Sequence, residues 1–423
     1  MFKWLWVMAF AFAQAPGVAE AALTAQGAED RLIIAYRDGV PQADQRRLAE
    51  AQGLKVVDEI PSLRFLLVQA APGKSLSAQV RLKSDPKVWR VEKDIWRNWL
   101  ESETASFQQS NLPAVSSVLK ELPRLAGGPR AVPGAAGDAE VPWGVKRVNA
   151  PAAWSSNQGA GVKVAVVDTG IDPEHPELKG LIAGGHNSVD KNAPWADDHF
   201  HGTHVAGTIA AKLNEVGVVG VAPKASLYAV KVLTKEGSGS LFGIMDGIMW
   251  CAQNGIQVAN MSLGAPQEMP LLQYALQMAA NAGTVVVAAA GNDGKAVNWP
   301  AAYPETIAVS ALCPPGITNA KLCPTAAEGI STFSSRGPEV DFIAPGVLIP
   351  STVPLVHDAS GIKAYSGTSM ATPHVAGLAA LAVAKGAHGA DAVRAALNAA
   401  ARKLDGMSAS EQGAGLIDAA GLR

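Results

Sequence analysis

The sequence predicts a doubly wound α/β domain, with a mostly parallel sheet, that follows a small ferredoxin-like α+β unit. Two patterns support this fold class. From about residue 160 onward, near-continuous apolar runs alternate with helical stretches rich in small residues, as in strands buried on both faces of a parallel sheet. Residues 30–100 instead follow the order strand, helix, strand, strand, helix, strand, which is typical of a ferredoxin-like unit.

The large domain is predicted to cover residues 138–423. Because ligands bind at the carboxyl ends of parallel strands, polar residues that end its apolar runs are candidate site residues. The expected strands cover residues 162–168, 226–233, 258–263, 284–290 and 306–312. The expected helices cover residues 204–213, 241–255, 269–283 and 367–384.

The small unit is predicted from its turn residues and apolar periodicity. A strand over 31–37 precedes an amphipathic helix that ends at Gly53. Two strands then flank Pro61, and a second helix stops at Pro86 before the last strand.

Residues 1–21 have the features of a signal peptide. Lys3 supplies a positive charge, residues 4–13 are apolar, and residues 19–21 (Ala-Glu-Ala) offer a cleavage site. We therefore expect export, to an extracellular or periplasmic location. The apolar run is shorter than the roughly 20 residues that span a bilayer, so we expect no membrane anchor. An ordinary buried N-terminal helix is the alternative.

Composition limits the partners and separates the two units. The formal net charge is −2, from 35 Lys and Arg against 37 Asp and Glu, without a basic block. This balance gives no support to a nucleic-acid or anionic-membrane partner, and we expect a monomer. Residues 101–137 are rich in Ser, Gln, Pro, Gly and Ala without a sustained period, so they are predicted to be a linker.

The chain contains three cysteines. Cys313 and Cys323 bracket a short stretch that contains Pro and Gly, and in an exported protein such a pair is expected to form a disulfide across a loop. Cys251 lies in an expected helix, where free cysteines are usually buried small hydrophobic residues.

Three residues stand where predicted elements begin or end. Asp168 ends a buried strand, His201 begins a helix, and Ser369 lies where a turn enters an apolar helix. A buried carboxylate can hold an imidazole, and a helix N-terminus favours a developing oxyanion. Each residue also has a structural alternative, namely a turn carboxylate, a helix-packing histidine and an N-cap serine.

Residues 168–172, 201–208 and 367–377 resemble the three catalytic blocks of the subtilisin family of serine peptidases, in the family's order Asp, His, Ser. The resemblance extends over residues 141–422. It implies a doubly wound fold and hydrolysis of peptide bonds by acyl transfer, with protein or peptide substrates.

The resemblance also implies the role of each residue. Ser369 would attack the peptide carbonyl, His201 would take and return the proton, and Asp168 would orient the imidazole. By position, Asn292 would donate to the oxyanion from its side chain, together with the Ser369 backbone N–H.

Substrate recognition follows by position from the same resemblance. A strand would bind an extended peptide, an apolar pocket would hold the fourth residue before the cut, and a primary pocket would hold the residue at the cut. No acidic cluster is evident near Asp168, so we do not expect strict specificity for basic residues. The residues are Ser262, Leu263 and Gly264 for the strand, Leu241 and Ile244 for the apolar pocket, and Ala289, Asp293 and Asn298 for the primary pocket.

A structural calcium ion is implied by position, and no catalytic cofactor is expected. All the donors would be oxygen atoms, as a hard cation requires. Glu177 replaces a usual Asp, and Ala139 stands where a Gln ligand is expected, although Asp138 or Glu140 could substitute. The side chains of Glu177 and Asn214 and the carbonyls of Lys212, Val216 and Val218 are the expected ligands.

Residues 22–100 resemble the family's inhibitory propeptide, which implies an autoprocessed zymogen whose own propeptide is a partner. The family's propeptide tail occupies the cleft like a product, so we expect a first cut near Trp99 or Leu100. A primary cut near Gly137, after the linker, is the alternative. A generic ferredoxin-like interaction domain is the other interpretation of this unit.

Three other functions remain as alternatives. Asp197, Asp198, His199, His201 and His204 form an H-x-H-x-x-H cluster that suggests a metal-dependent hydrolase. A peptide ligase or macrocyclase would use the same acyl transfer, ending on an amine. A non-catalytic binding module on a protease fold is the third alternative.

Overall fold

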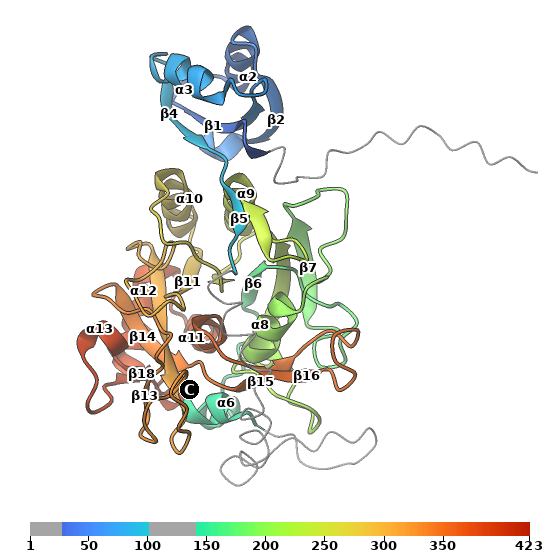
Figure 1. The fold of residues 1–423 in the computed structure, drawn as a ribbon. Coiled ribbons are helices and arrows are strands. Elements are labelled where there is room, and N and C mark those ends of the chain that lie inside the picture. Colours follow the sequence, from blue (N-terminus) through green and yellow to red (C-terminus); the bar gives the residue numbers. More distant parts are fainter. Residues whose placement is uncertain (1–27, 101–140) are drawn as a thin grey trace, which may run out of the picture.

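The computed structural model describes residues 28–100 and 141–423, which form a small domain seated on one end of a larger one (Figure 1). The predicted signal peptide of residues 1–21 and the predicted linker of residues 101–137 lie outside the described residues.

The small domain is a four-stranded antiparallel sheet with two helices, as predicted. Its strands pair in the order β2-β3-β1-β4. The elements are β1 (Arg31–Tyr36), α2 (Gln42–Ala51), β2 (Lys55–Ile60), the 3-10 helix η1 (Pro61–Leu63), β3 (Phe65–Gln69), α3 (Ser75–Lys83) and β4 (Val88–Lys93).

Strand β1 is apolar along most of its length because both of its faces are covered. Leu32 and Ile34 pack with Leu82 of α3. Ile33 and Ala35 point to the other face, where they join a cluster with residues of the large domain. The alternation follows the two-residue period of a strand. One face of the small domain's sheet therefore packs against the large domain.

The large domain is built on an eight-stranded sheet with the order β13-β12-β11-β10-β6-β8-β7, and β14 also pairs with β12. All pairs are parallel except that of β12 with β13. The strands are β6 (Lys163–Asp168), β7 (Ile182–Asn187), β8 (Ser226–Lys231), β10 (Val258–Met261), β11 (Val285–Ala289), β12 (Thr306–Cys313), β13 (Gly329–Ile330) and β14 (Val340–Pro345).

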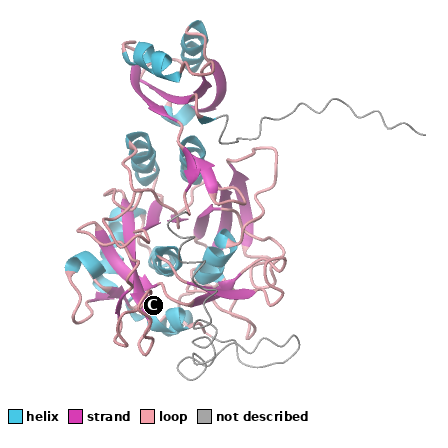
Figure 2. Ribbon diagram, in the orientation of Figure 1, coloured by secondary structure: helices cyan, strands magenta, loops and turns pink. Residues whose placement is uncertain are grey.

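Helices cover both faces of this sheet, which confirms the doubly wound α/β fold (Figure 2). Helices α8 (His201–Ala210), α11 (Thr368–Ala384) and α12 (Gly389–Ala400) pack in the core on one face. Helices α9 (Leu241–Gln253) and α10 (Pro270–Asn281) cover the other face and carry the small domain. Helix α11 is buried from Thr368 to Val383, because the sheet, α8 and α12 surround it.

Several elements were not predicted from the sequence. β7 (IAGGHN) is short, rich in Gly and half exposed at the sheet edge, so its residues carry no apolar run. Helix α12 buries only Val393 and Leu397. The remaining short elements are α6 (Trp143–Arg147), α7 (Pro151–Trp154), β9 (Ser238–Ser240), β15 (Ile349–Thr352), β16 (Ile362–Tyr365), β17 (Ala401–Arg402), α13 (Ala409–Gln412), β18 (Leu416–Ile417) and η3 (Ala419–Leu422).

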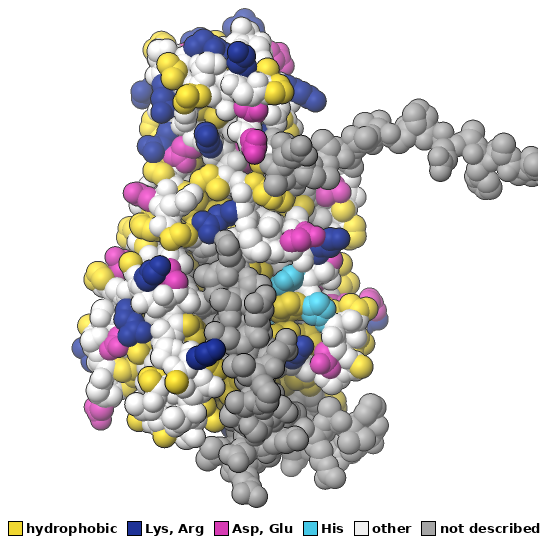
Figure 3. Space-filling model, viewed as in Figure 1, with side chains coloured by type: hydrophobic (Ala, Val, Ile, Leu, Met, Phe, Trp, Pro, Cys, Tyr) yellow, Lys and Arg dark blue, Asp and Glu magenta, His cyan; other side chains and the backbone are white. Residues whose placement is uncertain are grey.

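The predicted cysteine states are confirmed. Cys313 and Cys323 form a disulfide, and Cys251 is free and buried in α9. Within the two described ranges, no helix has the length and apolar character to cross a bilayer. On the face drawn in Figure 3, charges of both signs are interspersed over both domains.

Candidate active site

The carboxyl edge of the sheet brings Asp168 and His201 together. Asp168 is the last residue of β6, and His201 is the first of α8. The Nδ1 atom of His201 lies 2.9 Å from each carboxylate oxygen of Asp168, and both residues are fully buried. Because a carboxylate only accepts, Nδ1 carries the proton, which leaves Nε2 as the basic atom of the ring.

The histidines near His201 carry no charge at neutral pH. Burial lowers the pKa of His199 to about 4 and that of His204 to about 3. The Nε2 atom of His204 lies 3.1 Å from the carbonyls of Ile349 and Lys363. These neutral neighbours do not oppose the gain of a proton by His201.

Ser369 is the second residue of α11 and is fully buried. Its Oγ donates to the Ser262 carbonyl at 3.0 Å, and the Ser262 hydroxyl donates to the Ser369 carbonyl at 2.9 Å. The end of β10 and the start of α11 are thus locked together. The backbone N–H groups at this helix start are suited to stabilise an oxyanion.

Asn292 has one end of its side chain fixed and the other end unused. Its Oδ1 accepts from the Thr368 backbone N–H at 2.8 Å and from the Thr368 hydroxyl at 2.9 Å. Its Nδ2 is buried without a hydrogen-bond partner among the described residues. A buried amide donor without a partner is costly, and an oxyanion formed beside Ser369 would satisfy it.

The tail of the small domain enters the large domain as an added strand. β5 (Trp96–Asn98) pairs antiparallel with β9. Next to it, the Trp99 N–H donates to the Gly237 carbonyl at 3.0 Å, and the Gly264 N–H donates to the Trp99 carbonyl at 3.3 Å. The tail therefore lies between β9 and the segment after β10, as a bound peptide does in β-augmentation.

The side chains of the tail fill an apolar site. Trp99 and Leu100 are buried in one cluster with Leu241, Ile244 and Leu263, all three of which were predicted substrate residues. The strand residues Leu263 and Gly264 and the pocket residues Leu241 and Ile244 are thus brought together around the tail.

Comparison with known proteins places these features in a family. The subtilase family model matches residues 159–415, which is more than half of the chain. The chain belongs to the subtilase family. A second match, to the fervidolysin N-terminal prodomain, covers residues 13–92, so it begins inside the predicted signal peptide.

Individual relatives agree with this assignment. The chain is 47% identical over 252 residues to Subtilisin E of Bacillus subtilis (strain 168), which is 58% of this chain and 61% of the relative. It is 47% identical over 252 residues to Subtilisin of Bacillus pumilus, covering 85% of that protein. Subtilisin Savinase of Lederbergia lenta is 47% identical over 243 residues, with 83% of it covered. The chain spans about 61% of the length of Subtilisin E, and its large domain is the subtilase domain.

The residues predicted for the primary pocket lie at the end of β11 and in the segment that follows it. Ala289 and Asn298 are buried, and the Asn298 backbone N–H donates to the Ala290 carbonyl at 2.8 Å. Asp293 is exposed, and its Oδ1 accepts from the Ser335 hydroxyl at 2.6 Å. These side chains lie on the segment that carries Asn292.

The predicted calcium ligands lie around the end of α8. Glu177 is 5% exposed, and burial raises the pKa of its carboxyl. Its Oε2 has no hydrogen bond of normal geometry among the described residues, although the Asn214 side chain is close enough to favour the charged form. The Lys212 N–H donates to the Glu177 carbonyl at 3.2 Å. Val218 is buried, whereas Val216 is 59% exposed.

The side chains of the H-x-H-x-x-H cluster have separate partners. Asp197 accepts from Thr169 and Thr203, and Asp198 pairs with Lys231 at 2.6 Å. His199 stacks on Phe200 with ring centroids 4.2 Å apart. In the part of the chain that the structure describes, no three His, Cys, Asp or Glu residues gather as a metal site.

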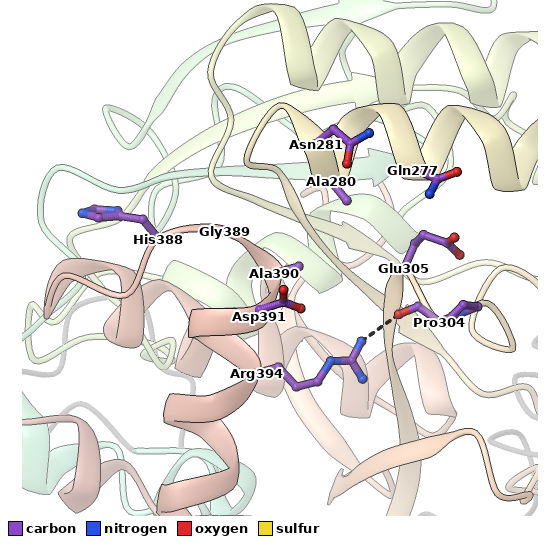
Figure 4. A pocket seen from close by; sticks show the side chains of 10 residues that line it. All are labelled: Gln277, Ala280, Asn281, Pro304, Glu305, His388, Gly389, Ala390, Asp391 and Arg394. Carbon is purple, nitrogen blue, oxygen red and sulfur yellow. Dashed lines mark hydrogen bonds between the residues drawn. The ribbon is translucent and has the colours of Figure 1, made fainter.

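A hollow of about 420 Å³ between α10 and α12 contains none of the predicted site residues (Figure 4). The Arg394 guanidinium at its edge donates to the carbonyls of Pro304 and Thr306 and pairs with Asp341. Its charge is therefore already compensated within the fold.

Two residues near the site were not singled out from the sequence. Thr368 fixes Asn292, and its place beside Ser369 in the block of residues 367–377 was an available signal. Ser335 contacts the segment around Asn292, and no sequence pattern pointed to it.

Proposed function

We propose that this chain is a secreted serine endopeptidase, made as an autoprocessed zymogen, that acts through an acyl-enzyme on Ser369. The observation that carries the proposal is the unpartnered Nδ2 of Asn292, because a buried amide donor of this kind is suited to an oxyanion. The contact of His201 with Asp168 and the place of Ser369 at a helix start support the same chemistry.

In this mechanism each group has a defined role. Ser369 Oγ attacks the peptide carbonyl while Nε2 of His201 takes its proton, and Asp168 stabilises the imidazolium that forms. The oxyanion accepts from Asn292 Nδ2 and from the Ser369 backbone N–H. His201 then gives the proton to the leaving amine, and water hydrolyses the acyl-enzyme.

The small domain is the inhibitory propeptide in this proposal, and its C-terminal tail is the first substrate. The buried Trp99 and Leu100 and the β5–β9 pairing support a first cut near these residues. The proposed units are the signal peptide 1–21, the propeptide 22–100, the linker 101–137 and the peptidase domain 138–423. A cut near Gly137 remains the alternative outcome.

The specificity that we propose is for large apolar or neutral residues at the cut, with a second apolar preference three residues upstream. The apolar surroundings of Trp99 and Leu100 support it. Profiling of the processed enzyme with a peptide library tests it, and a dominant requirement for Arg or Lys would contradict it.

Calcium is proposed as a structural ligand of the loop after α8. The buried Glu177 carboxylate, with an oxygen that lacks a hydrogen bond, fits a cation that takes only oxygen ligands. Calcium at 100 times its dissociation constant would add about 2.7 kcal/mol to the free energy of unfolding.

The calcium proposal is tested on the Ser369→Ala chain, in which autolysis is absent. We expect a chelator to lower its melting temperature, and Glu177→Gln to abolish this response. Glu174→Gln is the matched control, because Glu174 is an exposed carboxylate nearby that pairs with Lys179. A chelator response that persists in Glu177→Gln would contradict the site.

The experiment that tests the main proposal compares wild-type and Ser369→Ala chains. The wild type should process itself, cleave peptides and react with phenylmethylsulfonyl fluoride, whereas the variant should stay uncut. The wild type should also keep its activity in chelator at a temperature well below its melting temperature. N-terminal sequencing locates the first cut, and product mass distinguishes hydrolysis from ligation. Processing of the purified variant without another protease would overturn the proposal. Sedimentation of the purified protein tests whether it is a monomer. Fractionation of the producing cells tests whether it is secreted.

A further inference from the structure

The loop closed by the disulfide is anchored to the chain that follows it. Leu322 precedes Cys323, and its carbonyl accepts from the Ser331 hydroxyl at 2.8 Å and from the Thr332 backbone N–H at 3.0 Å. Because Cys323 is bonded to Cys313 at the end of β12, the disulfide holds this carbonyl in place. The position of residues 331–332 therefore depends on the closed loop.

The next residues pair with the segment that carries Asn292. The Gly294 N–H donates to the Phe333 carbonyl at 2.7 Å, and the Ser335 N–H donates to the Gly291 carbonyl at 2.8 Å. The Ser335 hydroxyl donates to Asp293 Oδ1 at 2.6 Å. Ser335 is fully buried, and it thus fixes the residues on both sides of Asn292.

The turn at Asn292 leaves little room for another arrangement. Gly291 has a φ of +112°, and a Cβ there would meet Asn298 Nδ2 at 2.5 Å and Ser335 Oγ at 2.9 Å. The backbone before Asn292 therefore lies directly against Ser335. An oxyanion donor has to be held to within about 0.5 Å of its productive place, so the contacts of this turn bear on the reaction.

We propose that Ser335 and the disulfide-closed loop of residues 313–323 position Asn292 as the oxyanion donor. This inference rests on the proposed function, because it takes Asn292 to be the oxyanion donor. It assigns no chemistry to Ser335 itself. Ser335 is a positioning residue that acts through Asn292. The loop provides the far anchor, through Leu322, Ser331 and Thr332.

A double-mutant cycle tests the proposal, with kcat and KM measured on a chromogenic peptide and normalised to processed enzyme quantified by mass spectrometry. Because the oxyanion forms only as Ser369 attacks and is absent from the bound substrate, Ser335→Ala should lower kcat with KM within about twofold. We expect a loss of about five- to tenfold in kcat. That is a fraction of the roughly 10²- to 10³-fold that removal of a whole donor costs, a magnitude established on subtilisins themselves.

The second arm repeats the substitution in an Asn292→Ala background. If Ser335 acts through Asn292, Ser335→Ala should leave the residual kcat of this background within about twofold, because the donor is already gone. Equal fold losses in both backgrounds would overturn the inference, and so would an unchanged kcat in the single variant. If Asn292→Ala itself leaves kcat unchanged, the oxyanion assignment of the proposed function fails instead.

Ser310→Ala is the matched control. Ser310 is also fully buried, and its hydroxyl donates to the Glu411 carbonyl at 2.6 Å and not to the segment that carries Asn292. It should lower the melting temperature with kcat unchanged. The pair Cys313→Ala and Cys323→Ala, made together, should lower kcat about two- to threefold in the wild type and not in the Asn292→Ala background. A kcat loss for the pair that is the same in both backgrounds would remove the loop from the proposal.

Discussion

Two buried aspartates, Asp168 in the active site and Asp94 between the domains, are satisfied to different degrees. Asp168 accepts from His201 Nδ1 and from the Thr169 backbone N–H. Asp94 accepts from the Phe242 N–H at 3.0 Å, at the start of α9. Its Oδ2 has no hydrogen bond of normal geometry among the described residues, although the Ser240 hydroxyl is close enough to favour the charged form.

The difference reflects what each site has to do. Asp168 belongs to one domain, where it is proposed to orient the imidazole of His201. Asp94 comes from the propeptide and meets a helix of the domain that the propeptide is proposed to leave. Burial raises the pKa of Asp94 to about 6, against the opposing effect of Arg31. The Nε and Nη1 of Arg31 also lack hydrogen-bond partners among the described residues, so this interface retains buried polar atoms without hydrogen bonds.

The largest effect that we predict comes from the fully satisfied carboxylate. Asp168→Asn keeps the shape but presents an amide to His201, which favours the wrong ring tautomer, so kcat should fall about 10⁴-fold. Steady-state kinetics on a peptide substrate measure it. Asp341→Asn is the control, because Asp341 is a carboxylate of the same domain that pairs with Arg394, and it should leave kcat unchanged. A loss below tenfold for Asp168→Asn would contradict the role of the pair.

The second prediction concerns release of the propeptide. The ordinary pKa of Asp94 is 3.8, and the docked value is about 6, so the docked state binds the proton more tightly. Docking is therefore favoured in full below about pH 4 and weakens as the pH rises to about 6, after which this contribution is constant. From the two pKa values, Asp94 alone should make release about 10²-fold easier at pH 8 than at pH 4.

Recovery of peptidase activity after the first cut measures this release, with samples incubated at each pH and assayed at one fixed pH. Asp94→Asn keeps an acceptor for the Phe242 N–H and should flatten the profile between pH 4 and 6. Glu92, whose pKa burial also raises, accounts for a residual slope. An unchanged pH profile in Asp94→Asn would show that protonation of Asp94 does not control release of the propeptide.

The smallest effect should come from an exposed ion pair at the same interface. Asp58 of β2 lies 2.6 Å from Lys191 Nζ, and both side chains are partly exposed. Exposed pairs contribute about 0.2–1 kcal/mol, so Asp58→Ala should accelerate release no more than a few fold, and less at high salt. If Asp58→Ala changed release of the propeptide as much as the titration of Asp94 does, exposed charge pairs would contribute as much to docking as the buried carboxyl.

The sequence predicted the elements whose side chains face a core along their whole length. β6, β8, β10, β11 and β12 were found because both faces of the sheet are covered, which makes their residues apolar in succession. β7 escaped because it is a half-exposed edge strand rich in glycine, without an apolar run, and α12 was also not predicted. The catalytic blocks were recognisable because their residues are close together in the chain.

The sequence by itself therefore determined the fold class, the order of the elements, and the identity of Asp168, His201, Asn292 and Ser369 as candidates. Only the tertiary structure decided that Asp94 meets the start of α9, that the tail after β4 pairs with β9, and that Ser335 holds the turn at Asn292. The physical reason is that periodicity reports which face of an element is buried. A hydrogen bond between segments far apart in the chain leaves no such pattern, because either partner alone looks like an ordinary polar residue.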